Sequence, residues 1–501
     1  MVQQAFKFGA FSFDAGRCRL TRGGEVIVIG QRAGAILSRL LQANGSVVSK
    51  DELFAAGWPG QIVEESNLSV QIAALRKALG QNAMGEDWIM TAQRMGYSFA
   101  MEPAKGGKGP SAIPSEQPNI AVLPFGNSSA EPGQDFFADG LTEDIITDLS
   151  NVPNFRVIAR NSTLVYKGKP TDVREIAQDL GVNYIVEGNV RKSADRVRVN
   201  VQLVNASSGT HVWAERFDRE LADVFALQDE VARRIVGAIS GKLGSEPSLR
   251  KRPGSIEAYE LCLRCRYMIT QSKEANEEAQ RFLLHAIELE PGYAEAYRRL
   301  AHSYCHQWLH YDESPAIYRA KSLVAAKLAV ELDPQDSGAY WVLAFVQSYE
   351  RHSTQANANF IKAIRLNPND ADARTMFGDF LLMEGKAAEA IETINEGLRL
   401  NPRPASWYYW LLGQALVQLG RYEEAVEVLN REETYRTSSR RVLAVALSKL
   451  GRKNEAKTEA ELFIATYPGA KTSIWNETRP FRRAEDLKFW VDAFKELGLP
   501  D

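Results

Sequence analysis

Cysteine is scarce in this 501-residue sequence, with four residues at Cys18, Cys262, Cys265 and Cys305. Such sparse use argues against a disulfide framework and fits a reducing compartment. Long apolar runs are missing too, since no stretch approaches the ~18 apolar residues that indicate a membrane-spanning helix. The first residues, MVQQAFKFGAF, lack the cationic start and apolar run of a signal peptide. We therefore expect a cytoplasmic protein with no membrane partner.

An excess of charge of one sign is also missing, because 60 Lys and Arg oppose 63 Asp and Glu, a net charge of −3. Any nucleic-acid site must therefore be local. Residues 1–101 carry ten basic against eight acidic side chains, so a mildly basic head precedes an acidic remainder. At roughly 150 residues per domain, a chain of this length predicts about three domains.

Signatures of catalysis are absent as well. The six histidines form no HExxH motif, no GxSxG turn appears, and FADGLTED lacks the pattern of a phosphate-binding loop. We therefore expect no enzyme, no catalytic residue and no cofactor. Five acidic residues cluster around one expected helix, at Asp135, Asp139, Glu143, Asp144 and Asp148. They could hold a cation, but acidic residues in a first turn also offset the helix dipole, and we interpret them as a solvated face.

Cys262 and Cys265 form a C-x-x-C pair, followed by HSYCH around Cys305. A zinc site is conceivable if two helices bring these residues together. However, Cys265 occupies the small crossing position of a helical repeat, where Gly or Ala would serve, and Cys262 lies one turn back. We therefore expect buried core cysteines and no metal site.

Repetition is the clearest positive feature of the sequence. Prolines that close ELEP, ELDP and RLNP strings are separated by 43, 34 and 34 residues, at Pro291, Pro334, Pro368 and Pro402. Small residues such as Gly378 and Gly413 recur where two helices must touch. These features resemble the tetratricopeptide repeat (TPR), in about six helical hairpins over 257–468. The resemblance implies an all-α solenoid whose concave face binds protein or peptide, and residues 469–501 are expected to form a helical cap.

The first hundred residues predict a small separate domain. Residues 5–29 alternate as a strand meander, a helix follows, and Ser49 with Glu52 forms a capping box that opens a second helix. A third helix begins at EESN, where Ser66 or Asn67 can cap it, and a strand hairpin (88–99) ends the domain. Strands, three helices and a terminal hairpin make a winged helix. Residues 101–118, with four prolines and three glycines, are expected to be a flexible linker.

The strings SKDELFAAGWPG, NLSVQIAALRKALG and RMGYSF, in this order, resemble the OmpR/PhoB-type effector domain. The variant of ToxR/CadC-like regulators is the most similar, and we assign residues 1–100 to such a DNA-binding domain. The resemblance implies that the third helix lies in the major groove and that the hairpin reaches the minor groove. Response regulators of this family often carry arginines where Ala73 and Ala74 stand. Affinity per domain is therefore expected to be modest, with a homodimer or tandem sites.

Leu68, Ile72, Leu75 and Leu79 recur on one face of the third helix and are expected to anchor it. On the other face, hydroxyl and amide groups can bond base edges, and small apolar groups can touch a thymine methyl. The two cations near the helix end suit phosphate, and the hairpin-tip arginine suits the minor groove. The predicted DNA-binding residues are Ser66, Asn67, Ser69, Val70, Gln71, Ala73, Arg76, Lys77 and Arg94.

Residues 119–245 alternate between strand and helix patterns. RVRVNVQLV alternates strictly, and NASSG is a turn into HVWAERF, which predicts an α/β module with an antiparallel meander. The strings IAVLPFGN and FFADGLTEDIITDLS resemble the TolB amino-terminal-like module that often stands between such a winged helix and TPRs.

The predicted fold class is therefore multidomain α+β: a winged helix, a central α/β module and an all-α TPR solenoid. Our first hypothesis is a soluble, one-component transcription regulator that binds promoter DNA and receives a protein or peptide signal, or self-associates, through the TPR array. The alternative is a TPR assembly scaffold whose winged helix binds protein. A nucleotide-related enzyme is a third option, because similar tails accompany nucleotide-cyclase-like domains, and we set it aside.

Overall fold

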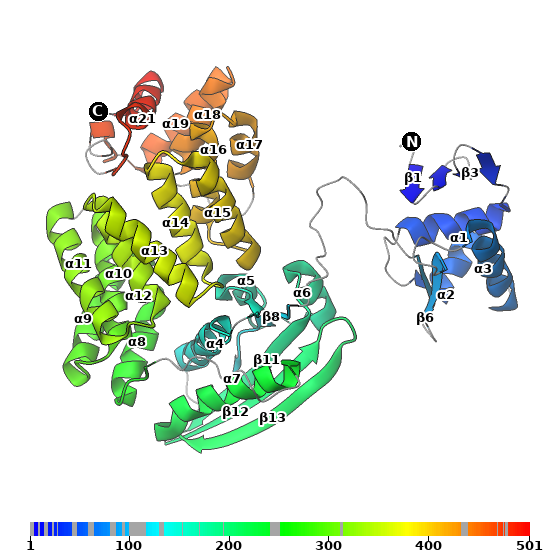
Figure 1. Ribbon diagram of the computed structural model, residues 1–501, viewed down its shortest axis with the longest axis horizontal. Helices are drawn as coiled ribbons and strands as arrows, with labels where there is room; N and C mark the ends of the chain where they lie inside the picture. The colour runs from blue at the N-terminus through cyan, green and yellow to red at the C-terminus, as the bar shows by residue number, and fades with distance from the viewer. Residues whose placement is uncertain are drawn as a thin grey trace. The chain divides into compact units, whose positions relative to one another are not determined.

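The computed structural model describes most of the 501-residue chain. The residues outside the description are 1–4, 9–10, 15–18, 23–24, 28, 43–47, 59–64, 81–86, 93–95, 100–116, 130–134, 153, 170, 194, 241–250, 311–313, 432–438, 468, 474, 476–478 and 501. The chain divides into two compact units, Met1–Ile113 and Pro114–Asp501 (Figure 1). No helix in the described part of the chain has the length and hydropathy needed to span a bilayer.

The first unit contains two small sheets around three helices. Its elements are β1 (Ala5–Phe8), β2 (Phe11–Asp14), β3 (Arg19–Arg22), β4 (Glu25–Ile27), α1 (Gln31–Gln42), β5 (Val48–Ser49), α2 (Lys50–Gly57), α3 (Glu65–Leu79), β6 (Ile89–Ala92) and β7 (Gly96–Phe99). Strands β1 to β4 form an antiparallel meander, and β5, β7 and β6 form a second sheet in that order. This is the element order of the predicted winged helix.

Aromatic side chains join the two sheets of this unit. The ring centroid of Phe8, from the first meander, lies 4.9 Å from that of Phe99 and 5.3 Å from that of Trp88. The same core takes up the apolar faces of α1 and α3. One correction concerns the start of α3, since the helix begins at Glu65 and Ser66 and Asn67 therefore lie in its first turn and not at its N-cap.

The second unit begins with a mixed sheet of order β10-β8-β11-β12-β13, with β9 paired to β11. Strand β8 pairs in parallel with β10 and β11, and β11, β12 and β13 form the predicted antiparallel meander. The strands are β8 (Asn119–Val122), β9 (Gly126–Asn127), β10 (Arg156–Val157), β11 (Tyr184–Ser193), β12 (Arg196–Asn205) and β13 (Thr210–Glu220).

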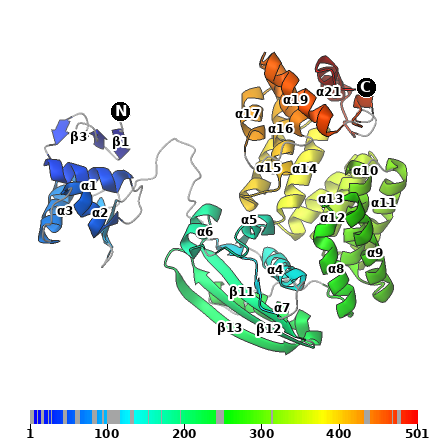
Figure 2. The same cartoon turned by 180° about the vertical axis from the view of Figure 1, so that it is seen from behind.

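Helices lie on both faces of this sheet: two of them cover one face, and a third packs on the opposite face of β8 and β11, near one end (Figure 2). They are α4 (Asp135–Ser150), α5 (Arg160–Leu164), α6 (Val173–Leu180) and α7 (Val224–Ser240), with a 3-10 turn at Leu221–Asp223. Alternate residues of β12, namely Val197, Val199, Val201 and Leu203, are buried against α4 and α7. The residues between them point to the opposite, polar face.

The remainder of the second unit is helical. Among the described residues, successive helices pair as α8 (Ile256–Met268) with α9 (Lys273–Leu289), α10 (Ala294–His310) with α11 (Pro315–Leu332), α12 (Ser337–Tyr349) with α13 (Ser353–Leu366), α14 (Ala371–Met383) with α15 (Ala387–Leu400), α16 (Ser406–Gln418) with α17 (Tyr422–Leu429), and α18 (Ser439–Lys449) with α19 (Lys453–Thr466). Close approach explains the glycines: a Cβ at Gly378 would lie 2.5 Å from Ile394, and one at Gly413 would lie 2.6 Å from Leu429.

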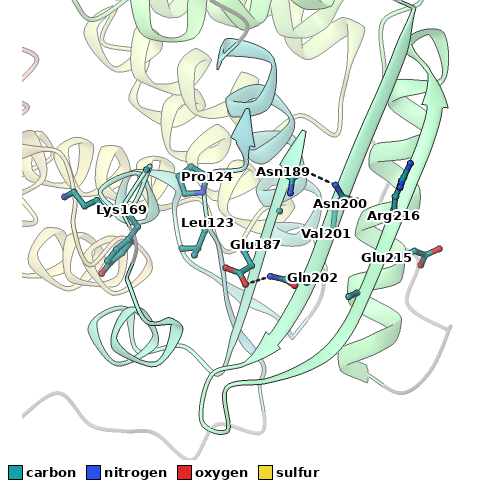
Figure 3. A pocket seen from close by; sticks show the side chains of 14 residues that line it. Leu123, Pro124, Lys169, Glu187, Asn189, Asn200, Val201, Gln202, Glu215 and Arg216 are labelled. Atoms are coloured by element: carbon teal, nitrogen blue, oxygen red, sulfur yellow. Dashed lines mark hydrogen bonds between the residues drawn. The ribbon is translucent and has the colours of Figure 1, made fainter. Parts of the chain in front are cut away.

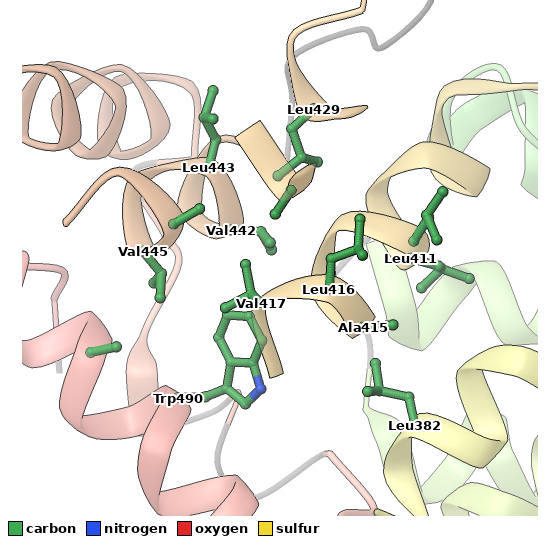
Figure 4. Close-up of a cluster of buried hydrophobic side chains, with 14 of the residues drawn as sticks. Leu382, Leu411, Ala415, Leu416, Val417, Leu429, Val442, Leu443, Val445 and Trp490 are labelled. Atoms are coloured by element: carbon green, nitrogen blue, oxygen red, sulfur yellow. The ribbon is translucent and has the colours of Figure 1, made fainter. Parts of the chain in front are cut away.

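A final helix, α21 (Ala484–Glu496), packs against the last repeats. Its Trp490 is fully buried beside Val417 of α16, and the indole nitrogen donates a 3.0 Å hydrogen bond to Gln418 (Figure 4). The helix thereby covers apolar surface at the end of the array that would otherwise face water.

Candidate nucleic-acid interface and the joint of the second unit

Helix α3 is anchored by the four residues that its periodicity predicts. Leu68, Ile72, Leu75 and Leu79 are each at most 1% exposed, and they pack into the core of the first unit. Because all four lie on one face, the orientation of the opposite face is fixed.

That opposite face is narrow and exposed. The side chains of Asn67, Ser69, Val70 and Ala73 are all exposed, and Val70 stands out at 63% for a large apolar residue. Gln71 is half-buried. A face made of such short side chains allows the helix backbone to approach another surface closely. Ser66 belongs to α3 but its side chain is not described, and Arg94 lies outside the described residues.

The two cations of α3 differ in their surroundings. Lys77 is exposed. Arg76 is half-buried, and its Nε donates a 2.8 Å hydrogen bond to the carbonyl oxygen of Ile89. The same nitrogen lies 3.5 Å from a carboxylate oxygen of Asp87, and the guanidinium lies 6.0 Å from the ring centroid of Tyr97. Arg76 therefore ties the end of α3 to the hairpin, a role that its sequence position did not reveal.

Asp135 is exposed, but the other acidic residues of α4 are not the solvated face that we expected. Asp139, Asp144 and Asp148 are buried, because α4 packs against the first repeat helices. Arg266 of α8 lies 2.9 Å from Asp144 and 3.0 Å from Glu143. The helix-dipole argument failed because the cations that balance Asp144 and Asp148 come from residues more than 100 positions away.

Asp144 is the centre of this buried network. One of its oxygens accepts hydrogen bonds from Tyr259 at 2.5 Å and from Gln228 at 3.0 Å. Burial disfavours the charge on Glu143, but three arginines, with Arg266 foremost, hold the pKa of Glu143 below its ordinary value. Ionised carboxylates and guanidiniums therefore join α4 to the repeats.

A second cation extends this contact between the central module and the repeats toward the C-terminal end of α4. Arg252, just before α8, lies 2.7 Å from Asp148 and 3.0 Å from Asp229 of α7. Asp139 instead pairs within its own module, 2.8 Å from the ammonium group of Lys167. No group of three or more His, Cys, Asp or Glu that could hold a metal ion occurs among the residues described.

The turns between later repeats form a further contact with the central module. The Asn369 side chain donates 2.9 Å hydrogen bonds to the carbonyl oxygens of Ser150 and Phe155, and it accepts one from the backbone of Val157. Asn401, in the turn of the next repeat, accepts a 2.6 Å hydrogen bond from Ser162 of the central module. The module and the array therefore meet through two independent sets of buried polar contacts.

The described cysteines are core residues, as predicted. Cys262, Cys265 and Cys305 are at most 1% exposed and unpaired, and burial raises the pKa of the Cys265 and Cys305 thiols to about 12. Thiols with pKa values this high are poor nucleophiles and poor metal ligands at neutral pH. Cys18 lies outside the described residues.

A shallow cavity of about 780 Å³ lies on the polar face of the central sheet (Figure 3). Its floor presents Glu187, Asn189, Asn200 and Gln202. These side chains pair with one another across the strands, with Asn200 donating a 2.8 Å hydrogen bond to Asn189 and Gln202 donating to Glu187. The polar side chains of the cavity floor therefore form hydrogen bonds with one another. The geometry of the cavity alone does not indicate a ligand.

Three family models match separate stretches of the chain. They are Transcriptional regulatory protein, C terminal (residues 24–99), HilA/YgeH-like transcriptional regulator, second domain (116–234), and Anaphase-promoting complex, cyclosome, subunit 3 (318–432). The chain thus combines an OmpR/PhoB-type DNA-binding domain of transcription regulators with a HilA-like regulator domain and TPR repeats.

Curated relatives carry three different names. The transcriptional regulator HilA of Salmonella typhimurium is 25% identical over 393 residues, which are 77% of this chain and 69% of that protein. Putative adenylate cyclase 3 of Rhizobium meliloti is 42% identical over 255 residues, which are 49% of this chain and 43% of that protein. The chain thus spans less than half of the cyclase relative. The Tol-Pal system protein TolB of Methylococcus capsulatus is 28% identical over 127 residues, covering 25% of this chain and 28% of that protein.

Two solved structures are similar to parts of the chain. The APC/C hetero-tetramer Cut9-Hcn1 is 17% identical with a TM-score of 0.38, covering 48% of this chain and 42% of that chain. The Klebsiella pneumoniae RstA DNA-binding domain in complex with the RstA box is 26% identical with a TM-score of 0.18, covering 19% of this chain and 97% of that chain.

Proposed function

We propose that the protein is a sequence-specific transcription regulator that seats α3 in the major groove of promoter DNA. The observation that carries this proposal is the exposed face of Asn67, Ser69, Val70 and Ala73, set opposite four buried leucine and isoleucine anchors. Short side chains let the helix enter the groove, where amide and hydroxyl groups can bond base edges. Lys77 is placed for phosphate, and Ser66, Gln71 and Arg94 complete the proposed contact set. Because the target is promoter DNA, the proposed site of action is the cytoplasm.

The TPR array is proposed to receive a protein or peptide partner. The central module is proposed to be TolB-like. It would move together with the array, because buried ion pairs and hydrogen bonds join the two. We propose that two copies bind adjacent half-sites. The proposed base-reading face of α3 has few long side chains that can donate hydrogen bonds, so the affinity of a single domain should be modest. No catalytic activity is proposed, and a cyclic nucleotide assay on the purified chain checks this statement directly.

Selection of random duplexes by the full chain at moderate salt tests the assignment. A regulator enriches one sequence, and a variant carrying Asn67→Ala, Val70→Glu and Lys77→Ala should enrich none while its helical circular dichroism stays unchanged. All three side chains are exposed, so the substitutions leave the core intact. Enrichment by neither protein would favour the alternative, a TPR scaffold whose winged helix binds protein.

A further inference from the structure

The central sheet has one closed edge and one open edge. At the closed edge, β10 is only two residues long, and the backbone nitrogen of Val157 donates a 3.1 Å hydrogen bond to Asn369 of the repeats. At the opposite edge, β13 runs for 11 residues, and no described strand pairs with its outer side (Figure 1). Proteins usually keep edge strands short or cover them, because unpaired backbone groups recruit another strand. The long open edge of β13 therefore calls for a partner.

The ladder between β12 and β13 determines which backbone groups face the open edge. The backbone nitrogen of Leu221, directly after β13, donates a 2.6 Å hydrogen bond to the carbonyl oxygen of Asp195. Bonded and non-bonded pairs alternate along an antiparallel ladder, so the backbone of Phe217 is also turned toward β12. The register shift between the two strands lies before Trp213, so this alternation holds over residues 214–220. The outward positions are therefore Ala214, Arg216, Asp218 and Glu220.

These outward positions are accessible. The side chains of Ala214, Arg216 and Glu220 are exposed. The outward carbonyl oxygen of Asp218 accepts a 3.2 Å hydrogen bond from the side chain of Arg219, its own neighbour in the strand. A backbone nitrogen of an added strand could replace that side chain. Residues 214–220 thus form a regular stretch that another strand can extend.

The charges along this stretch match a second copy of the same stretch in one register. Two antiparallel copies must place outward positions opposite outward positions, so a two-fold axis must pass through a residue of the strand. With the axis at Phe217, Arg216 faces Asp218 of the second copy. On the other face of the sheet, Glu215 faces Arg219 of the second copy. An axis at residue 216 or residue 218 instead places Arg216 or Asp218 opposite itself, and like charges in direct opposition are destabilising.

Arg216 has no close partner in its own copy among the described residues. Its side chain is 59% exposed, and its guanidinium lies 3.7 Å from Asp218. The carboxylate of Asp218 has nearer partners on β12, since Arg196 lies 2.8 Å and Arg198 lies 2.6 Å away. Hydrogen bonds from these two arginines lower the pKa of Asp218 to about 2, so the carboxylate stays ionised at neutral pH. Both members of the pair between copies are therefore charged and exposed at the edge.

We propose that β13 is the contact between two copies of this chain, in which residues 214–220 pair antiparallel about a two-fold axis at Phe217 and join the two central sheets into one. The same surface serves both copies, as a two-fold dimer requires. A strand pair of this length is smaller than the interface of a permanent dimer, so the dissociation constant should be on the order of micromolar. The inference rests on the proposed function in one respect, since it supplies the contact through which two copies would bind adjacent half-sites.

Sedimentation equilibrium of the full chain without DNA, from about 1 to about 100 µM, measures this dimer. Arg216→Asp should raise the dissociation constant by roughly tenfold or more, because an aspartate would then face Asp218 at two symmetric positions. Arg191→Asp makes the same charge change at an exposed residue of the inner strand β11. This matched control should dimerise like the unchanged chain, and thermal unfolding checks that both variants are folded.

A pair of cysteines tests the register. Ala214 of one copy and Glu220 of the other would form a hydrogen-bonded pair, whose Cα atoms lie about 5.5 Å apart, within the range of a disulfide. The full chain carrying both Ala214→Cys and Glu220→Cys should therefore form a covalent dimer under mild oxidation. Either substitution alone should give no more covalent dimer than the unchanged chain.

An unchanged chain that stays monomeric at the highest concentration would overturn the proposal. A dimer that Arg216→Asp leaves intact would also overturn it, and so would the lack of a disulfide in the double cysteine variant. Binding to a duplex with one half-site is measured separately and should be equal for the unchanged chain and Arg216→Asp. Lost DNA binding with an intact dimer would reject the regulator assignment alone, whereas a monomer that binds one half-site would reject only the dimer.

Discussion

The Nε of Arg76 and the carbonyl oxygen of Ile89 are joined by a 2.8 Å hydrogen bond between the last turns of α3 and the first residue of β6. The nearby carboxylate of Asp87 adds a charge to this contact. The proposed binding mode, with α3 and the hairpin in adjacent grooves, requires a fixed relative position of the two. Arg76 provides a direct link between them.

Lys77→Ala is predicted to weaken DNA binding without changing the choice of sequence. An exposed lysine near the end of α3 would neutralise one phosphate, so the slope of log affinity against log salt should decrease by about 1. Anisotropy titrations of a selected and a scrambled duplex at several salt concentrations measure both effects. An unchanged slope would remove Lys77 from the interface.

Arg76→Ala is predicted to affect stability as well as binding. Loss of the hydrogen bond to Ile89 should lower the free energy of unfolding by about 1 kcal/mol, and it should loosen the hairpin against α3. The fall in DNA affinity should therefore exceed that of Lys77→Ala. Urea unfolding and the same titrations compare the two variants; identical behaviour of both would mean that the tie to the hairpin is irrelevant to binding.

Asn67→Ala is predicted to relax specificity. Removal of an amide that bonds a base edge should reduce discrimination between the selected and a point-mutated duplex by about 1–3 kcal/mol. The unfolding midpoint should stay unchanged because Asn67 is exposed. Ala74→Ser, an exposed neighbour outside the predicted contact set, serves as the control. Full discrimination by the Asn67 variant would place base reading elsewhere.

Periodicity carried most of what the sequence could predict. The spacing of Leu68, Ile72, Leu75 and Leu79 predicted the buried face of α3, and the strict alternation of RVRVNVQLV predicted β12 and its one buried face. Gly378 and Gly413 were interpretable because helix crossings have a local signature. These features depend on neighbours a few residues apart, which a single sequence displays directly.

Periodicity could not predict contacts between residues that lie far apart in the sequence. Asp144 was assigned to solvent because its cation, Arg266, is 122 residues away. Asn369 carried no signal that the sequence analysis used, yet it binds the backbone of the central module 219 residues earlier. Asn401, from the second RLNP string, likewise accepts a hydrogen bond from Ser162 of the central module, but the recurrence of Asn in these strings does not identify the partner.

Arg266→Met is predicted to be among the most destabilising single substitutions in the second unit. The arginine side chain is 5% exposed, and its removal would leave the buried Asp144 without its cation. Breaking such a pair should cost about 3–5 kcal/mol. Urea unfolding of the full chain measures it, and Asp144→Asn combined with Arg266→Met should lose less than the single variant, because the uncompensated charge is gone. A double variant no better than the single one would mean that packing, not charge, dominates the joint.

Acid should destabilise the repeats through His302. Burial, reinforced by Arg298 and Arg299, lowers the pKa of this half-buried imidazole from 6.5 to about 4. Its ring also lies 4.9 Å from that of His306 and 5.5 Å from that of Trp341, in centroid distances. As the pH falls from 6.5 toward 4, the unfolded chain takes up a proton that the folded chain does not, so stability is lost in that window.

His302→Gln should therefore reduce the loss of stability between pH 7 and pH 5 by about 1 kcal/mol, a figure that allows for the partial exposure of the ring. Urea unfolding of the full chain at the two pH values measures this difference. His285→Gln, on an exposed site of α9, changes the histidine count equally and should leave the pH dependence as it is. The same pH dependence in all three proteins would show that the imidazole of His302 is as easily protonated in the fold as in water.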